Sequence, residues 1–443
     1  MNTDYTTDRA ARLKIWKRNR HQVGGPDAVK ANDSTAKLYA FQNPRMDDKV
    51  YTFVMNGTEY FPMAMRTLQS FTGLVFRKAP IFDGSDLFPQ AVSVDGQTAE
   101  ELARACFIEY MITNDGGLFI DTPDTPAGAT VAELERLNFY SYQTLYPAEA
   151  IREIRHQAIN GRKRLVYIRL IDDEYHGREL ELVDGIYQAT IWTRVKGQWF
   201  SETITPQVGG KPLTDIPFIP LNDGSNTAAM DGLCALNVVH FSNKFELQHI
   251  ISWVSTPFMY ITGVAEDVEL DLTTTSSIRL ENENAKIGWV THNGQGLSEI
   301  KDEISTIEQH GSMLGSRMLI QEKSVSEAEG TVARRQAGEN SILAGAARHV
   351  GGGCLTKAFK LQAMMQGKDA SAVRYSLNTD FVPTITDPAI LTAALALVQN
   401  GKMPDEAFFE LLQKMEIAHE SWDYETWMAM IDVQKGVSGT TIG

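Results

Sequence analysis

Two long segments of the chain place apolar residues along one side of a predicted helix. In residues 229–254, and again in residues 297–320, apolar positions recur every three or four residues, which is the period of an α-helix. The first stripe holds Leu233, Leu236, His240, Leu247, Ile251 and Val254, and the second holds Ile300, Ile304, Ile307, Leu314 and Met318. Pro257 ends the first segment. The pattern predicts two long helices. His240 and His249 are expected to be packing residues of the first helix rather than ligands.

The hydrophobic period changes between these two helices. Residues 258–296 contain short runs rich in β-branched and aromatic residues, "FMYITGV", "SIRLE" and "KIGWVTH", before "NGQGL" breaks the chain. These runs predict strands. We therefore expect a β module inserted between two helices that can lie antiparallel.

The rest of the chain also mixes helical and strand patterns. A buried helix, a turn at residues 114–117 and a strand at residues 118–121 are predicted from "ELARACFIEYMITNDGGLFIDTPD". Residues 162–220 are β-rich, with turns at Asp184–Gly185 and Lys196–Gly197, and predict an antiparallel meander. Residues 385–433 are helical again. The predicted fold class is α+β.

Residues 326–353, "SEAEGTVARRQAGENSILAGAARHVGGG", combine a helical pattern with many glycines. Each internal glycine costs about 1 kcal/mol relative to alanine, and three glycines in a row are expected to close the helix. Small residues let another backbone approach closely, and glycines make bending cheap. Arg334 and Arg335 stand in the middle, flanked by Glu327, Glu329 and Glu339. A buried helix in the core of a monomer explains the small residues. A helix packed beside copies of itself, with a polar edge facing a cavity, explains the charges as well.

The charge of the chain restricts its function. It carries 41 basic and 56 acidic residues, a net charge of −15. This balance argues against a protein that coats nucleic acid, but it is compatible with one past which nucleic acid slides. The basic residues of the first segment crowd around Trp16 and predict either a solvated helix face or a contact with an acidic neighbour or nucleic acid: Arg9, Arg12, Lys14, Lys17, Arg18 and Arg20.

The sequence offers little for catalysis, metals or membranes. No P-loop, nucleophile elbow, zinc-helix motif or dinucleotide fingerprint occurs, and the three cysteines have no metal-ligand spacing. Gly351–Gly353 could cradle a phosphate, but no strand precedes them, and the nearness of His349 to Cys354 in sequence is no argument for a catalytic pair. For Asp121 and Asp124 a role in a turn is favoured over a metal or catalytic site. No apolar run approaches the ~20 residues of a membrane span, and no secretory signal is visible. We expect a cytosolic protein at synthesis that is not an enzyme and needs no cofactor or metal.

The order of segments resembles the portal proteins of tailed bacteriophages, and more closely a portal-like family first catalogued as a domain of unknown function. The matching stretches are "RTLQSFTGLVFRKAP" (66–80), "GGLFIDTPD" (116–124), "YSYQTLYPAEAI" (140–151), "IPFIPLN" (216–222), "LNVVHFSNKFELQHIISWVSTPFMYITG" (236–263), "GSMLGSRML" (311–319) and "SEAEGTVARRQAGENSILAGAARHV" (326–350). Each is a weak motif alone. Their order and spacing carry the resemblance.

The resemblance implies the regions of the portal fold. Residues 1–228 would be the wing, residues 229–254 and 297–320 the two stem helices, and residues 255–296 a short clip. Residues 321–365 would be the tunnel loop and tunnel helix, and residues 366–443 the crown and C-terminal tail. It also implies a dodecameric ring at one vertex of the capsid that passes double-stranded DNA during packaging and ejection. The implied partners are terminase, a head–tail adaptor, the major capsid protein and a scaffold protein, in the virion and, during assembly, in the host cytoplasm.

The implied site residues fall in two groups. Lys323, Ser324, Arg334 and Arg335 are candidates for the DNA channel, although both arginines could instead pair with the neighbouring glutamates. Ile300, Ile304, Ile307 and Leu314 are candidates for stem packing. Two alternatives stay open: another phage head–tail connector ring, and a cellular α+β enzyme with an unrecognised site. Adaptors are usually much shorter than this chain, and ring assembly would separate the portal from the enzyme.

Overall fold

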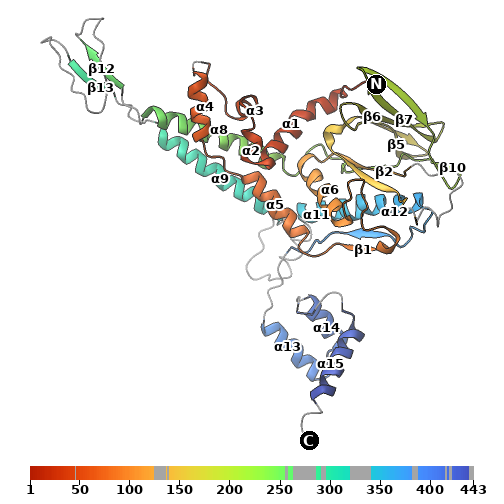
Figure 1. The fold of residues 1–443 in the computed structure, drawn as a ribbon. Helices are drawn as coiled ribbons and strands as arrows, with labels where there is room; N and C mark the ends of the chain where they lie inside the picture. Colours follow the sequence, from red (N-terminus) through yellow and green to blue (C-terminus); the bar gives the residue numbers. More distant parts are fainter. Residues whose placement is uncertain are drawn as a thin grey trace. The chain divides into compact units, whose positions relative to one another are not determined.

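The computed structural model divides the chain into two compact units, Met1–Thr379 and Asp380–Gly443, which are described separately (Figure 1). It describes residues 1–44, 46–123, 136, 139–254, 258–262, 286–290, 296–319, 341–381, 388–414, 417–418 and 422–438. The predicted mixture of helices and sheets is confirmed. No helix in these ranges is long and apolar enough to cross a membrane.

The first unit begins with five helices, α1 (Thr7–Gly24), α2 (Pro26–Val29), α3 (Asp33–Tyr39), α4 (Asp48–Gly57) and α5 (Met63–Val75). Asn32 and Asp47 cap α3 and α4, because their side chains accept backbone N–H groups of the first turn. Helices α3 and α4 pack on α8 (Asp231–Val254) through a cluster of buried side chains that includes Tyr39, Tyr51, Tyr60, Phe241 and Phe245.

The four arginines of α1 point toward carboxylates of the same chain, whereas Lys14 and Lys17 are exposed. The guanidinium of Arg9 is buried and lies 3.0 Å from Oδ1 of Asp115, and Arg12 lies 3.0 Å from Oδ2 of the same carboxylate. Arg20 pairs with Glu109 and Glu149, and Arg18 pairs with Asp231. The prediction of a solvated face is therefore wrong for these four arginines. Their acidic neighbours belong to the same chain, far away in sequence.

Helix α6 (Ala99–Thr113) and the small sheet behind it form the centre of the first unit. Thr98 and Glu101 form a reciprocal capping box at the start of α6, and Asn114, with φ of 44°, ends it. Strand β2 (Gly117–Asp121) then pairs with β3 (Tyr142–Tyr146) and β11 (Phe218–Pro220). The predicted helix, turn and strand are confirmed. Strands β1 (Ile81–Asp83) and β14 (Arg374–Ser376) form a separate antiparallel pair.

A five-stranded antiparallel meander confirms the predicted β-rich region. Its strands are β4 (Ile151–Ile159), β5 (Arg162–Ile171), β6 (His176–Val183), β7 (Ile186–Val195) and β8 (Gln198–Ile204), in chain order. Three of its turns use two residues with positive φ, which fits the right-handed twist of the strands: Asn160–Gly161, Asp184–Gly185 and Lys196–Gly197. Strand β4 was not predicted, because its second half is polar and exposed. A short hairpin, β9 (Gln207–Val208) with β10 (Lys211–Pro212), follows.

The three consecutive glycines do not end a helix, contrary to the prediction. Helix α11 (Ile342–Arg348) continues through a π-helical segment, His349–Leu355, into α12 (Thr356–Met365). Gly351 lies against strand β14 so closely that a Cβ atom there would be 2.9 Å from the backbone nitrogen of Leu377. Gly351 therefore permits a close approach of two backbones within a continuous helical run.

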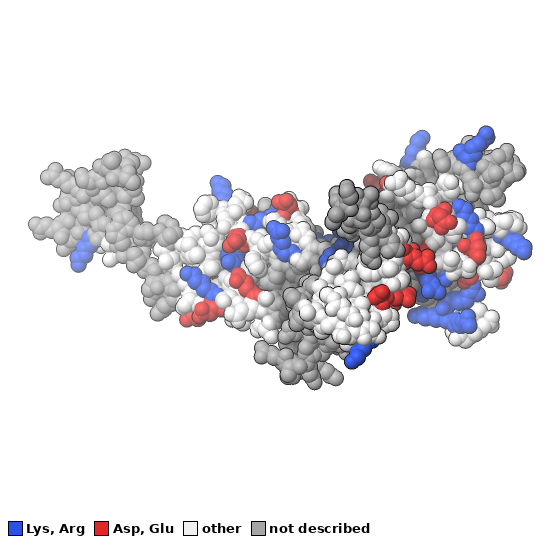
Figure 2. All heavy atoms as spheres, turned by 90° about the horizontal axis from the view of Figure 1, so that it is seen from below, with Lys and Arg blue, Asp and Glu red and all other residues white. Residues whose placement is uncertain are grey.

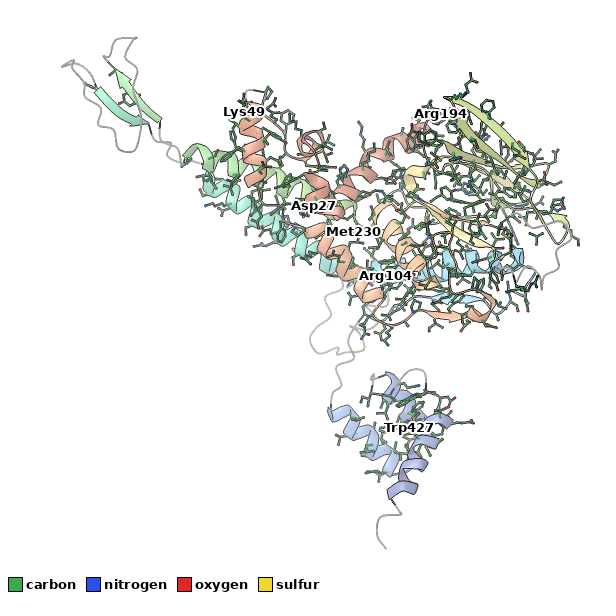
Figure 3. All side chains as sticks on the ribbon, viewed as in Figure 1. Asp27, Lys49, Arg104, Arg194, Met230 and Trp427 are labelled. Carbon is green, nitrogen blue, oxygen red and sulfur yellow. The ribbon has the colours of Figure 1, made fainter. Side chains whose placement is uncertain are left out.

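The described residues of the second unit form three helices, α13 (Pro388–Gln399), α14 (Asp405–Lys414) and α15 (Tyr424–Ser438), as the sequence predicts for this region. Aromatic side chains join α14 to α15. The ring of Trp427, labelled in Figure 3, lies 5.0 Å from that of Phe409 and 6.0 Å from that of Tyr424, measured between centroids.

Candidate functional site

The two long helices lie side by side and antiparallel (Figure 1). They are α8 and α9 (Leu297–Leu319), close to the predicted ranges 229–254 and 297–320. Between them in the chain, β12 (Phe258–Thr262) pairs with β13 (Lys286–Val290) in an antiparallel hairpin. Both predicted strand runs are confirmed, whereas the third run, "SIRLE", lies outside the described residues.

The seam between α8 and α9 contains part of the predicted apolar stripe. Ile304 and Ile307 are 5% and 3% exposed, so both are already buried within a single chain. Ile300 and Leu314 are half-buried. The outward-facing residues at the start of α9 are mainly acidic, and Glu299, Asp302 and Glu303 are exposed there.

His240 links the two helices. It is fully buried, and its Nε2 lies 3.0 Å from Oε1 of Glu308 on α9. Its ring packs against Phe61, with the centroids 5.3 Å apart. The described residues contain no group of three or more His, Cys, Asp or Glu side chains placed to hold a metal ion. Its burial and its contacts with Phe61 and Glu308 make His240 part of the packing between the helices.

Helix α9 approaches α5 through glycine. A Cβ atom at Gly311 would overlap the sulfur of Met63, and one at Gly315 would lie 3.7 Å from Cγ2 of Thr67. Glycines four residues apart occupy the same side of a helix and let a second helix come close. Gly311 therefore lets the C-terminal half of α9 lie close to α5, whereas a side chain at Gly315 would make an ordinary van der Waals contact.

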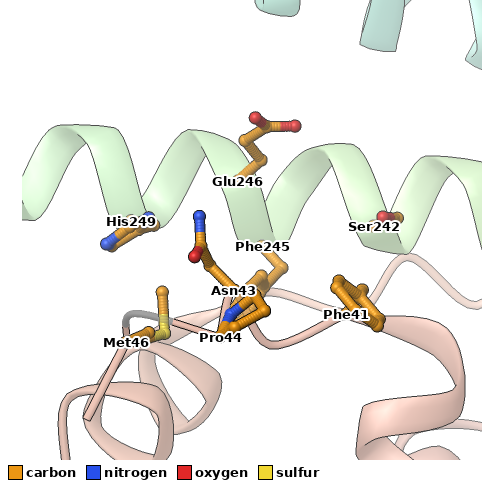
Figure 4. A pocket seen from close by; sticks show the side chains of 8 residues that line it. All are labelled: Phe41, Asn43, Pro44, Met46, Ser242, Phe245, Glu246 and His249. Atoms are coloured by element: carbon orange, nitrogen blue, oxygen red, sulfur yellow. The ribbon is translucent and has the colours of Figure 1, made fainter.

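A pocket of about 280 Å³ lies along α8 (Figure 4). The chain between α3 and α4 runs beside the helix, with Met46 and His249 at one end of the pocket and Phe41 and Ser242 at the other. Burial lowers the pKa of His249, which favours the neutral ring. The lining is completed by Asn43, Pro44, Phe245 and Glu246. Four of the eight lining residues are apolar and four are polar or charged, and Phe41 is 76% exposed at the edge of the pocket.

Cys354 and His349 of the glycine-rich segment lie in contact, which spacing rules for an α-helix do not predict. Residues five apart meet on a π-helix, and Sγ of Cys354 lies 3.5 Å from Nε2 of His349. The same nitrogen lies 2.8 Å from the carbonyl oxygen of Leu221. Burial raises the pKa of Cys354 to about 11, so the sulfur is a buried, protonated thiol and not a nucleophile.

The other chemical candidates also have structural roles. Asp121 is the last residue of β2, and its carboxylate accepts the backbone N–H of Thr122 and pairs with Arg178. Gly351–Gly353 lie inside the π-helical segment. Asp124 and the four channel candidates, Lys323, Ser324, Arg334 and Arg335, lie outside the described residues, together with the glutamates that could pair with the arginines. These assignments remain predictions.

Comparisons with known proteins bear on the same region. A family model described as "Domain of unknown function (DUF4055)" matches residues 229–365, which run from the start of α8 to the end of α12. No curated protein matches the chain.

Three solved structures resemble the chain. It is similar to a chain of the virion of a native gene transfer agent (GTA) particle, with 11% identity and a TM-score of 0.39, covering 88% of this chain and 95% of that one. It is also similar to chains from the neck of an empty GTA particle computed with C6 symmetry and the neck of a native GTA particle computed with C12 symmetry, each at 11% identity. The TM-scores are 0.42 and 0.41, and the alignments cover 86% and 84% of this chain and 96% and 95% of those chains.

Proposed function

We propose that the chain is a portal subunit, which assembles into a dodecameric ring at one vertex of a phage-type capsid. The observation that carries the proposal is the antiparallel pair α8 and α9 with a β hairpin between them in the chain. This is the order of stem, clip and stem that the resemblance implies. Residues 1–228 then form the wing, residues 321–365 the tunnel loop and helix, and residues 366–443 the crown.

A closed ring needs two different faces of each subunit to meet, since the contacts run head to tail. The helix pair leaves apolar side chains uncovered for such contacts. Val239 on α8 and Met313 on α9 are 46% and 48% exposed. The isoleucines Ile304 and Ile307 serve the pairing of α8 with α9 inside each subunit.

The proposed ring conducts double-stranded DNA during packaging and ejection, and a separate terminase supplies the energy. The exposed acidic residues at the start of α9 and the net charge of −15 suit this role, because phosphates do not adhere to an acidic wall. Lys323 and Ser324, with Arg334 and Arg335, contact the DNA transiently. The clip docks terminase and the head–tail adaptor, while the wing meets the major capsid protein and scaffold.

Mass photometry combined with negative-stain electron microscopy of the purified protein tests the proposal. Rings of twelve copies with a central hole are expected. A monomer or dimer that persists at high protein concentration and with scaffold present would contradict it and favour the cellular enzyme. A ring of a different copy number would favour another head–tail connector.

The channel residues need a separate test, because a ring can assemble without them. Replacing Lys323 with Gln is expected to leave ring formation unchanged and to reduce DNA packaging, measured as nuclease-protected DNA per particle. Lys402→Gln, between α13 and α14, is the matched control, since it also removes one lysine charge, from an exposed position outside the proposed channel. Normal packaging by the Lys323 variant would remove this residue from the channel.

A further inference from the structure

One segment of this acidic chain is strongly basic. Residues 154–171, "IRHQAINGRKRLVYIRLI", contain five Arg and Lys residues and no Asp or Glu. They form the second half of β4, the turn at Asn160–Gly161, and β5. The face seen in Figure 2 shows that both signs of charge are interspersed over the molecule, so a segment with only one sign stands out.

The basic residues lie on a two-stranded ribbon that extends past the third strand of the meander. Strand β6 pairs with β5 only from Tyr167 onward, whereas Arg162, Lys163 and Arg164 pair only with β4. The turn at Asn160–Gly161, with φ of 51° and 73°, is the tight two-residue type. The ribbon therefore presents its tip beyond the edge of the sheet.

Two cations at this tip have no acidic partner among the described residues. Arg162 faces Ile159 across the ribbon, and Lys163 faces Ala158, so the cross-strand neighbours are neutral. Both side chains are exposed. By contrast, Arg155 pairs with Glu153 and stacks on Tyr167, and Arg169 pairs with Glu153 and Glu179.

Arg164 adds a third cation that is anchored but still accessible. Its Nη2 lies 2.5 Å from Oδ1 of Asp215 and 2.7 Å from the carbonyl oxygen of Thr214, and its side chain is 31% exposed. Nearby, burial and the charge of Lys163 lower the pKa of His156. The tip has a positive local potential even though the chain as a whole is acidic.

We propose that the tip of the β4–β5 ribbon binds the phosphate backbone of double-stranded DNA through Arg162, Lys163 and Arg164. This is a contact separate from the channel and does not require a ring. Side chains alternate between the two faces of a strand, so Arg162 and Arg164 lie on one face, about 6.8 Å apart, and Lys163 lies on the other.

Cations on both faces of a narrow ribbon suit a DNA groove, because a phosphate row flanks each side of it. The major groove, about 12 Å wide, admits a two-stranded ribbon. An acidic protein surface would be approached from one face and would normally gain its affinity from aromatic anchors. The tip, residues 158–164, has no aromatic residue. Contacts to phosphate alone predict binding without sequence preference.

The salt dependence of DNA affinity sets the size of the effect that the test should measure. With three phosphate contacts, the slope of log K against log salt is about −2.7, so affinity falls about 40-fold between about 50 and about 200 mM salt. The double variant Arg162→Gln/Lys163→Gln keeps one contact, and its affinity should fall only about 3- to 4-fold over the same range. Affinity is measured by fluorescence anisotropy with a labelled duplex of about 20 base pairs at each salt concentration.

The matched control, Lys14→Gln/Lys196→Gln, also removes two positive charges. Both lysines are exposed, and neither forms an ion pair among the described residues. It should retain the wild-type slope. Mass photometry of every variant reports assembly separately from DNA binding. The proposal is wrong if the wild type shows no salt-dependent binding to the duplex, or if the slope is unchanged in the ribbon variant. It is also wrong if polyglutamate binds the wild type as tightly as the duplex does and loses affinity to the same extent in the ribbon variant. The last result would instead identify an acidic protein as the partner.

Discussion

The buried carboxylate of Asp115 allows the importance of the α1 arginines to be measured. Asp115→Asn keeps the size of the side chain and removes its charge. The carboxylate lies 3.0 Å from both Arg9 and Arg12, and the Asp115 and Arg9 side chains are 8% and 7% exposed. The variant therefore leaves the Arg9 charge buried without its partner.

Removing one member of a buried ion pair costs about 3–5 kcal/mol. Arg9 keeps two hydrogen bonds, to the carbonyl oxygens of Ile151 at 2.7 Å and Ala148 at 2.8 Å, which places the expected loss near the lower limit. Arg12 is 20% exposed and can turn toward water. We therefore expect Asp115→Asn to reduce the free energy of unfolding by about 3 kcal/mol, more than a hundredfold in the equilibrium constant.

Urea unfolding at neutral pH, followed by tryptophan fluorescence, measures this loss. Trp16 is a local reporter, because Arg9 and Arg12 each lie 5.0 Å from its ring and its Nε1 donates to the carbonyl oxygen of Thr113. Asp173→Asn serves as control, since this exposed carboxylate pairs only with His176 and nearby backbone amides, and should change the midpoint little. A loss below about 1 kcal/mol for Asp115→Asn would refute the view that this ion pair holds α1 in place.

Three further predictions concern the glycine-rich segment, a loop anchor and the thiols. Gly351→Ala should destabilise the protein by about 1–3 kcal/mol, because the added Cβ would meet the backbone nitrogen of Leu377, directly after β14. Gly352→Ala has open space around it and should stabilise the protein by up to about 1 kcal/mol. Thermal unfolding measures both variants, and equal shifts of the two melting temperatures would contradict this assignment. Burial opposes ionisation of Asp223, but hydrogen bonds from Asn114, Ser225 and Tyr110 outweigh this effect and lower the pKa of Asp223 to about 2. The ionised carboxylate therefore stabilises the fold above about pH 4, and this stability is lost as the pH falls from about 4 to about 2. Melting temperatures across this range should fall more steeply for the wild type than for Asp223→Asn, and parallel curves would exclude the anchor. Because burial also raises the pKa of Cys354, iodoacetamide at pH 7 should label it only after denaturation, and mass spectrometry of the labelled native protein would expose an accessible thiolate.

The long elements could be predicted because their own residues specify them. Helices α8 and α9 carry continuous apolar stripes. The strands of the meander alternate apolar and polar residues, and the turns that join them contain glycine. Strand β4 was missed because its exposed half holds Arg155, His156 and Gln157, and it is a strand through its pairing with β5. Propensity alone cannot reveal pairing with a neighbour.

The inward direction of the α1 arginines could not be predicted for a related reason. Their partners, Glu109, Asp115 and Glu149, are about a hundred or more positions away in the sequence, and only the folded chain brings them together. A run of basic residues has the same pattern whether it faces water or buried carboxylates. The π-helical meeting of His349 and Cys354 was missed because spacing rules for α-helices pair residues three or four apart.

The π-helical segment at residues 349–355 sets the rotational phase of everything that follows it. A π turn equals an α turn with one residue added, and each residue of an α-helix advances the helix by about 100°. If all the residues of this segment were wound as an ordinary α-helix, the extra residue would rotate α12 by that amount relative to α11. Ala358 and Phe359, both fully buried, would leave the core, and polar neighbours would enter it. The wide π turn therefore absorbs the extra residue and keeps α11 and α12 facing the same core.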